Sequence, residues 1–266
     1  MKFVRYIAKD GSRRAGIVGP DQAIRLIEGD VFGSYEVTEQ TRSIEDIQQY
    51  LVPVDIPNIV ALGLNYVDHA SESKMELPEL PLVFLKTTTS LTAHGRPIVI
   101  PEEAPSEVDY EAELGVIIGK TAKHVATEDV ADHIFGYTCV NDVSARDCQL
   151  RIDKQWARGK SFDTFCPVGP TVETELDTKS LRVRLWLNGR CMQDGSTGDM
   201  IFSVADTISF LSRNMTLLPG TLVMTGTPPG VGFARKPPVF LKPKDKVVVE
   251  IEGLDKLENN VVAEQR

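Results

Sequence analysis

Residues 107–119 read EVDYEAELGVIIG, and this stretch decides how the middle of the chain folds. Acidic side chains at alternate positions lead directly into the apolar run 114–118. Because alternate side chains of a β-strand share one face, we expect Asp109, Glu111 and Glu113 to project the same way. Two carboxylates entering a buried strand repel each other and lose hydration, and a divalent cation would compensate for both costs. An acidic, solvent-facing strand edge is the alternative interpretation.

A second acidic position, Asp142, favours the cation site. Residues 135–141 are expected to form a strand, and Asp142 follows it where a helix over 144–156 would begin. Helix capping would also explain an Asp at this junction. However, Asp142, Arg146 and Gln149 are spaced i, i+4 and i+7, so they line one face if the helix begins early. Such a stripe suits a metal together with an anionic ligand.

The types of ligand indicate which metal would bind. Glu111, Glu113 and Asp142 offer three carboxylates without paired His or Cys ligands, which favours Mg²⁺ first and Mn²⁺ second. Zinc is disfavoured because the nitrogen and sulfur ligands that it prefers are missing. The four cysteines show no CxxC spacing, which is typical of reduced, mostly buried thiols in a cytoplasmic protein.

A candidate general base precedes this region. His69 lies in GLNYVDHASE, just after the apolar strand expected at 59–62. Glu72 follows three residues later and would orient the imidazole if this stretch is helical. The pair would then activate a water molecule. A surface histidine with an incidental salt bridge is the alternative.

Two further motifs offer groups that bind anions. Lys160 follows Gly159 in ARGKSFDTF, but position 154 is Lys where a nucleotide-binding P-loop needs Gly, so we reject nucleotide binding. A lysine in this apolar, aromatic stretch is a candidate for binding an anion. Thr227 belongs to the rigid turn TGTPPGVG at 225–232, which would offer backbone amides and a hydroxyl to the same pocket.

Composition places the chain among ordinary globular proteins. It has 266 residues, 42% of them apolar and 25% charged, with a net charge of −9. The acidic balance argues against nucleic acid and anionic membrane surfaces as partners. The apolar runs are also too short for a membrane span, and the N-terminus does not resemble a secretory signal.

The order of the expected elements indicates an α+β fold with a large mixed or antiparallel sheet. Strands dominate from residue 58 onward, and the helices expected at 144–156 and 203–215 do not alternate with them regularly. Before them, residues 1–55 carry short strands and a helical stretch at SIEDIQQYL, with Ser43 as its N-cap. We therefore predict a small β-rich subdomain, residues 1–55, followed by a catalytic domain, residues 56–266.

The order of the motifs resembles the fumarylacetoacetate hydrolase family. Six motifs occur in the family's order over residues 58–260, namely GLNYVDHASE, PLVFLK, EVDYEAELGVIIGK, GYTCVNDVSARDCQ, GKSFDTFCPVGP and PGTLVMTGTPPGVG. The resemblance implies a mixed β-sandwich roll, a homodimer, and Mg²⁺ or Mn²⁺ held by Glu111, Glu113 and Asp142. It also implies a water-activating dyad of His69 and Glu72, and substrate contacts from Arg146, Gln149, Lys160 and Thr227.

One difference between this sequence and the family pattern limits which substrates are expected. The founding fumarylacetoacetases carry an extra metal-ligating Asp just upstream of the histidine, where this chain has Leu62-Gly63-Leu64. We therefore expect another 2-oxo acid in place of fumarylacetoacetate. Specificity is expected to lie in a mobile lid, residues 73–86. The apolar side chains of Met75, Leu77 and Leu80 would contact substrate there or pack into the core.

The site predicts hydrolysis of a carbon–carbon bond in a 2,4-dioxo acid such as an acylpyruvate. Cleavage would leave a pyruvate enolate that a Lewis acid stabilises, while Lys160, Arg146 and Gln149 hold the anionic end. Decarboxylation of oxaloacetate and isomerisation of a hydroxymuconate-type acid would use the same metal and anion-binding residues, so both remain alternatives. A non-catalytic, metal-stabilised binding module is a further alternative, although a structural cation would need neither Lys160 nor the His69–Glu72 pair.

Overall fold

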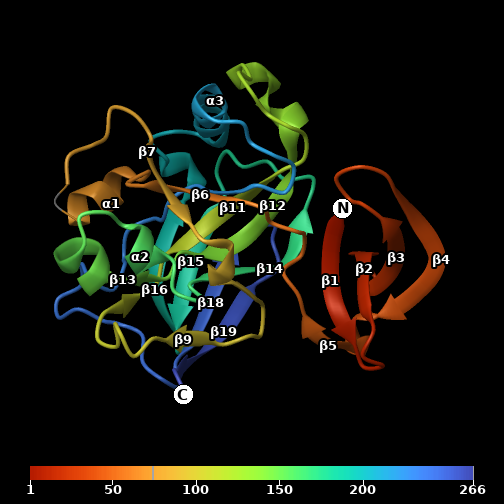
Figure 1. Cartoon of the computed structure of the whole chain (residues 1–266), viewed down its shortest axis with the longest axis horizontal. Coiled ribbons are helices and arrows are strands. Elements are labelled where there is room, and N and C mark those ends of the chain that lie inside the picture. The colour runs from red at the N-terminus through yellow and green to blue at the C-terminus, as the bar shows by residue number, and fades with distance from the viewer. Residues whose placement is uncertain (74, 266) are drawn as a thin grey trace.

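The structure is a computed structural model that describes residues 1–73 and 75–265, and β-strands dominate it (Figure 1). The larger sheet has twelve strands. They are β1 (Lys2–Ala8), β2 (Arg13–Val18), β3 (Ala23–Gly29), β4 (Tyr35–Ser43), β5 (Ile47–Tyr50), β6 (Ile59–Gly63), β7 (Leu82–Lys86), β8 (Leu91–Ala93), β11 (Ala112–Ile118), β12 (Ile134–Asn141), β14 (Cys166–Glu173) and β17 (Leu222–Met224).

A smaller sheet packs against the middle of the larger one. It contains five strands, β9 (Ile98–Ile100), β15 (Arg182–Leu187), β16 (Arg190–Ser196), β18 (Lys246–Ile251) and β19 (Leu257–Ala263). A separate two-stranded ladder joins β10 (Val108–Asp109) to β13 (Ser144–Ala145). Parallel pairs occur beside antiparallel ones, as in β6 with β17 and β8 with β14. The predicted α+β class with a mixed sheet is confirmed.

The central strands form the core that supports the site. Every residue of β11 is buried, and β11 pairs with β12 on one side and β17 on the other. Leu114 and Val116 share one hydrophobic cluster with Val183 and Val249 of the smaller sheet. Each such side chain contributes about 1.5–3 kcal/mol when it is fully buried. The acidic residues at the start of β11 are therefore attached to a fully buried strand of the core.

The N-terminal strands extend this same sheet. The short strands expected here are β1–β3, and β4, which was not expected, completes a meander with them. β1 pairs with β14, so that the sheet continues into the rest of the chain. Figure 1 shows these strands together at one end of the molecule. The division into residues 1–55 and 56–266, of which Arg266 lies outside the described residues, stays a prediction.

The helix expected at residues 43–51 is wrong. Ser43 does cap a helical turn, but that turn is a single 3-10 turn, Ile44–Asp46. Residues 47–50 form β5, which pairs with β1. A helix of this length is marginal by itself, and sheet pairing supplies hydrogen bonds that an isolated helical turn lacks.

Residues 144–156 do not form one continuous helix either. They begin with β13 and continue into a turn with π-helical hydrogen bonding, Cys148–Ile152, and α2 (Ala157–Lys160) follows. Asp147, not Asp142, caps the turn by accepting a hydrogen bond from the Cys148 amide. The pairing of β13 with β10 holds the start of this segment extended.

The remaining helices lie outside the sheets. The expected helix at 203–215 is α3 (Val204–Asn214), and Ser203 and Asp206 form a capping box at its start. The short helix α1 (Val67–Glu72) follows β6. Among the described residues, no helix is long and apolar enough to cross a membrane.

Candidate active site

Three carboxylates meet at the ends of two paired strands. Ala112 of β11 lies opposite Asn141 of β12, which places Glu111 beside Asp142, and the Asp142 amide donates to the Glu111 carbonyl at 2.8 Å. One carboxylate oxygen each from Glu111, Glu113 and Asp142 lies within 4.8 Å of the others, and all three residues are buried. The structure thus brings together the three predicted metal ligands.

The chemistry of this cluster fits a divalent cation. The Glu113 carboxylate accepts a hydrogen bond from the Gly226 amide at 2.8 Å through Oε2, but its buried Oε1 has no hydrogen-bond partner among the described residues. Burial and the neighbouring carboxylates of Asp142 and Glu111 raise the pKa of Glu113 well above its usual value. A buried carboxylate with a free oxygen and acidic neighbours is a ligand for a hard cation such as Mg²⁺ or Mn²⁺.

Lys160 contacts two of these carboxylates. Its ammonium lies 2.9 Å from Glu111 Oε2 and 2.6 Å from Asp142 Oδ2, and the side chain is buried. An ammonium has three N–H donors, so one of them remains for a ligand. The predicted anion-binding role is compatible with this placement, because Lys160 also lines the cavity described below.

A second buried lysine, Lys86, was missed. Its ammonium donates to Asp142 Oδ1 at 2.5 Å and to the carbonyls of Val143 and Phe165 at 3.3 and 2.9 Å. All three donors are used within the protein, so Lys86 positions Asp142 and leaves no donor for substrate. The alternation along β7 could have predicted that Lys86 is buried, because Lys86 shares the buried face with Phe84, but it does not indicate which residue Lys86 contacts.

Arg146 connects the carboxylate cluster to Asp109 and Gln149. Its Nε donates to Asp109 at 2.9 Å, one terminal nitrogen donates to Glu111 at 2.5 Å and the other to Gln149 Oε1 at 2.8 Å. Although burial acts in the opposite direction, the Lys160 and Arg146 cations hold the pKa of Glu111 below its usual value. Two of the five guanidinium N–H groups remain for a ligand.

The predicted helix face shared by Asp142, Arg146 and Gln149 is wrong, although Arg146 and Gln149 do contact each other. Arg146 precedes the helical turn that contains Gln149, and Asp142 pairs with Lys86 and Lys160 instead. Asp109, expected to face the same way as Glu111, also accepts hydrogen bonds from the amides of residues 232 and 233. This network fixes Arg146 without a helix face.

His69 and Glu72 form a hydrogen-bonded pair on α1, as the sequence predicts. Nδ1 of His69 lies 2.8 Å from Glu72 Oε1, and the histidine is buried. The Gly230 amide lies 3.0 and 2.9 Å from the two carboxylate oxygens of Glu72 and holds them in place. Because a carboxylate only accepts, the proton of a neutral imidazole is on Nδ1, and Nε2 is the basic atom.

Thr227 lies at the site, but its hydroxyl is already engaged. The hydroxyl donates to the Ala112 carbonyl at 2.8 Å and accepts from Gln193 Nε2 at 2.7 Å. Its hydrogen is therefore unavailable to substrate. The contact between Thr227 and substrate stays a prediction, and the structure gives the residue a role in fixing the 225–232 turn against β11.

The candidate residues border a small cavity of about 40 Å³. Six of the predicted residues line it, together with apolar side chains: His69, Glu111, Arg146, Gln149, Lys160 and Thr227, with Leu62, Leu64, Phe84, Trp156 and Phe233 among the apolar ones. Glu72, Glu113 and Asp142 are not among the lining residues, but Glu72 hydrogen-bonds to His69, and Glu113 and Asp142 cluster with Glu111. The cavity therefore combines a base, cations and a carboxylate cluster.

The lid predicted at residues 73–86 is wrong at its C-terminal end, and for residues 73–81 it stays a prediction. Residues 82–86 form β7 and pair with β6, so they belong to the sheet. Met75, Leu77 and Leu80 are exposed, so they do not pack into the core. Ser73 and Met75 border the cavity. Lys74 lies outside the described residues.

Replacing Lys86 by methionine should destabilise the metal-free protein. Breaking a buried ion pair costs about 3–5 kcal/mol, and we expect roughly 2–3 kcal/mol here because Lys160 still contacts Asp142. Urea denaturation in the presence of a chelator measures this change in the free energy of unfolding. Lys9→Met, on an exposed lysine, is the matched control. Equal stabilities of the two variants would contradict the positioning role.

Comparison with known proteins identifies the family. A family profile described as "Fumarylacetoacetate (FAA) hydrolase C-terminal" matches residues 58–262. The chain belongs to the fumarylacetoacetate hydrolase family. A second profile, "Rv2993c-like, N-terminal", matches residues 1–53. The resemblance carried by the ordered motifs is confirmed.

Relatives within the fumarylacetoacetate hydrolase family include proteins named for an activity on oxaloacetate. "Oxaloacetate tautomerase Fahd2a, mitochondrial" from Rattus norvegicus is 45% identical over 217 residues, which cover 80% of this chain and 69% of that protein. "Oxaloacetate tautomerase fahd2, mitochondrial" from Xenopus laevis is 46% identical over 217 residues, 80% of this chain and 68% of that protein.

Solved structures of the family share the fold over the whole chain. The fumarylacetoacetate hydrolase from Exiguobacterium antarcticum has a TM-score of 0.89 at 34% identity and covers 99% of this chain and 100% of its own. The 2-hydroxyhepta-2,4-diene-1,7-dioate isomerase from Mycobacterium marinum has a TM-score of 0.87 at 36% identity, with both chains covered fully at 100%. The predicted roll architecture is therefore confirmed, and the chain is an enzyme of this family.

Proposed function

We propose that this enzyme interconverts the keto and enol forms of oxaloacetate with the help of bound Mg²⁺ or Mn²⁺. The observation that carries the proposal is that one small cavity is lined both by His69, which Glu72 holds by a hydrogen bond, and by Glu111, one of the three clustered carboxylates. The names of the rat and frog relatives support oxaloacetate as the substrate.

The residues fit a cation that acts as a Lewis acid. Glu111, Glu113 and Asp142 would hold it, and when bound it would stabilise negative charge that develops on the 2-oxo oxygen. Lys160 and Arg146 would bind the substrate carboxylates through their remaining N–H donors. Asp109 and Gln149 keep Arg146 in place for this contact.

The proton transfer is assigned to His69. Nε2 would take a proton from carbon 3 of the keto form, and the pair of C–H electrons becomes the new C=C bond. The 2-oxo oxygen then receives a proton, so that one proton has moved and no other reactant is consumed. Glu72 would stabilise the imidazolium and keep Nδ1 protonated throughout.

One wall of the cavity is aromatic. Trp156 and Phe84 meet edge to face with their centroids 5.6 Å apart, and both side chains line the cavity. This apolar wall would lie against the carbon chain of the substrate, while the cations bind its carboxylates.

Hydrolysis of an acylpyruvate is the second candidate function. It is favoured by the same oriented histidine, because Nε2 could equally take a proton from water, and the resulting hydroxide would attack the 4-carbonyl. Decarboxylation of oxaloacetate needs no such base. The two proton-transfer functions therefore depend on His69, and decarboxylation does not.

The experiment that tests the proposal follows the enol absorbance of oxaloacetate with and without metal. We expect the enol absorbance to decay faster with enzyme and Mn²⁺ or Mg²⁺ together than with the metal alone. A chelator should abolish this acceleration, and added metal should restore it. Parallel assays measure pyruvate release from oxaloacetate and from an acylpyruvate. Pyruvate release without faster enol decay would contradict tautomerisation and support decarboxylation or hydrolysis.

We also propose that the enzyme is a homodimer, as the family resemblance implies. The chain mass is 29.4 kDa, so light scattering after size-exclusion chromatography should give about twice this mass. A mass equal to that of one chain would contradict the proposal.

A further inference from the structure

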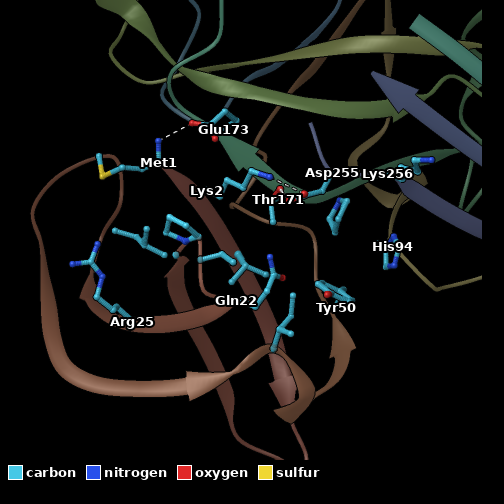
Figure 2. A pocket seen from close by; sticks show the side chains of 17 residues that line it. Met1, Lys2, Gln22, Arg25, Tyr50, His94, Thr171, Glu173, Asp255 and Lys256 are labelled. Carbon is cyan, nitrogen blue, oxygen red and sulfur yellow. Dashed lines mark hydrogen bonds and ion pairs between the residues drawn. The ribbon is translucent and has the colours of Figure 1, made fainter. Parts of the chain in front are cut away.

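A second and much larger cavity lies away from the candidate active site. Its volume is about 580 Å³, within the range of about 300–1,000 Å³ typical of small-molecule sites. It lies between the N-terminal strands and the central part of the molecule, and it shares no lining residue with the active-site cavity (Figure 2). Nothing in the proposed tautomerase reaction uses it.

The floor and one end of this cavity are apolar or aromatic. Val4 and Ile17 of the N-terminal strands are buried, and Val18, Ile44 and Pro170 also line it. At one end, the rings of Tyr50 and His94 meet edge to face with centroids 4.8 Å apart. This lining suits a ligand with an apolar or ring-shaped body.

The carboxylates in the wall are already neutralised. Asp255 accepts hydrogen bonds from the Lys2 ammonium at 2.8 Å and from the Thr171 hydroxyl at 2.7 Å. Glu173 accepts from the Met1 amine at 2.7 Å (Figure 2). Neither carboxylate therefore needs a cation from a ligand.

One cation in the wall is unpaired. Within residues 1–73 and 75–265, the exposed Arg25 guanidinium has no ion pair and no side-chain hydrogen bond, and the side chain of Gln22, which also lines the cavity, has no partner. Figure 2 shows Arg25 on the side of the cavity opposite Tyr50 and His94. An acid with an apolar body would pair its head group with Arg25 and place its body toward the aromatic end.

We propose that this cavity is a second ligand site, which binds a small amphipathic acid through Arg25 and the Tyr50–His94 end. The ligand class follows from one unpaired cation at one end, the apolar and aromatic side chains of the floor and the other end, and wall carboxylates that already have partners. Binding there is independent of the metal cluster, since the two cavities have no residue in common.

Fluorescence titration with two probes tests this site on the intact chain. The anionic probe is 8-anilinonaphthalene-1-sulfonate, and the neutral one is N-phenyl-1-naphthylamine. We expect Arg25→Gln to weaken binding of the anionic probe about two- to fivefold and to leave the neutral probe unchanged, as for loss of one exposed ion pair. The matched control is Arg13→Gln, which removes an exposed arginine outside the cavity.

A cavity-filling variant locates the binding. Val18→Trp should abolish binding of both probes while the melting temperature and the oligomeric state stay those of the wild type. Equal weakening by Arg25→Gln and Arg13→Gln would overturn the proposal, because the effect would then be one of net charge. Unchanged binding to Val18→Trp would also overturn it, as would a change in oligomeric state, which would assign the cavity to a contact between copies of the chain.

Discussion

Replacing Glu113 by glutamine is expected to lower turnover of oxaloacetate by about a thousandfold or more. The substitution keeps the size of the side chain and its place beside the Gly226 amide, but it removes one negative ligand from the cluster. A Lewis acid that stabilises an enolate supplies several kcal/mol, and about 4 kcal/mol corresponds to a factor of a thousand. Calorimetric titration with Mn²⁺ should show the corresponding loss of affinity.

In the absence of metal, the same variant should be more stable than the wild type. The pKa of Glu113 is raised in the folded protein, so its ionised form destabilises the fold at pH values above the ordinary carboxyl pKa. Glutamine removes this cost, and metal-free Glu113→Gln should unfold at a higher urea concentration than the metal-free wild type. Glu103→Gln, at an exposed position, is the control and should change neither property.

Replacing His69 by asparagine is expected to lower turnover about 10³- to 10⁴-fold and to leave Mn²⁺ affinity unchanged. General acid–base catalysis contributes factors of this order, and His69 is the side chain whose free ring nitrogen borders the cavity. Steady-state rates with oxaloacetate measure the first effect, and calorimetry measures the second. Asparagine still offers a polar group to Glu72.

The control for this variant is His124→Asn. His124 is exposed and has a backbone φ of 54°, a conformation that asparagine tolerates well. It should keep full activity. Two results would contradict the assignment of His69 as the base: an active His69→Asn enzyme, or an inactive one that has also lost Mn²⁺ binding.

Most of the strands could be predicted from the sequence because they alternate or are apolar throughout. The site could be predicted in part, since Glu111 and Glu113 stand beside a buried strand and Asp142 stands at the end of its neighbour. Pairing of β11 with β12, which the sequence does not show, brings these residues together. The roles of the individual site residues stay predictions until the variants are measured.

The residues that escaped prediction are held by long-range contacts. Lys86 contacts Asp142, 56 positions away, and no local pattern marks it as a partner of a carboxylate. The segment after Asp142 has a helical pattern, but pairing of β13 with β10 prevents one continuous helix. In both cases, tertiary contacts overrode what the local sequence indicates.

The cation site can be tested most directly by diffraction from crystals grown with Mn²⁺, using the anomalous signal of the metal. The account predicts one strong anomalous peak within coordination distance, about 2.0–2.3 Å, of Glu111, Glu113 and Asp142 in the wild type, and no peak there in Glu113→Gln. A strong peak elsewhere with none at these carboxylates would contradict the account, as would a peak that persists unchanged in the variant.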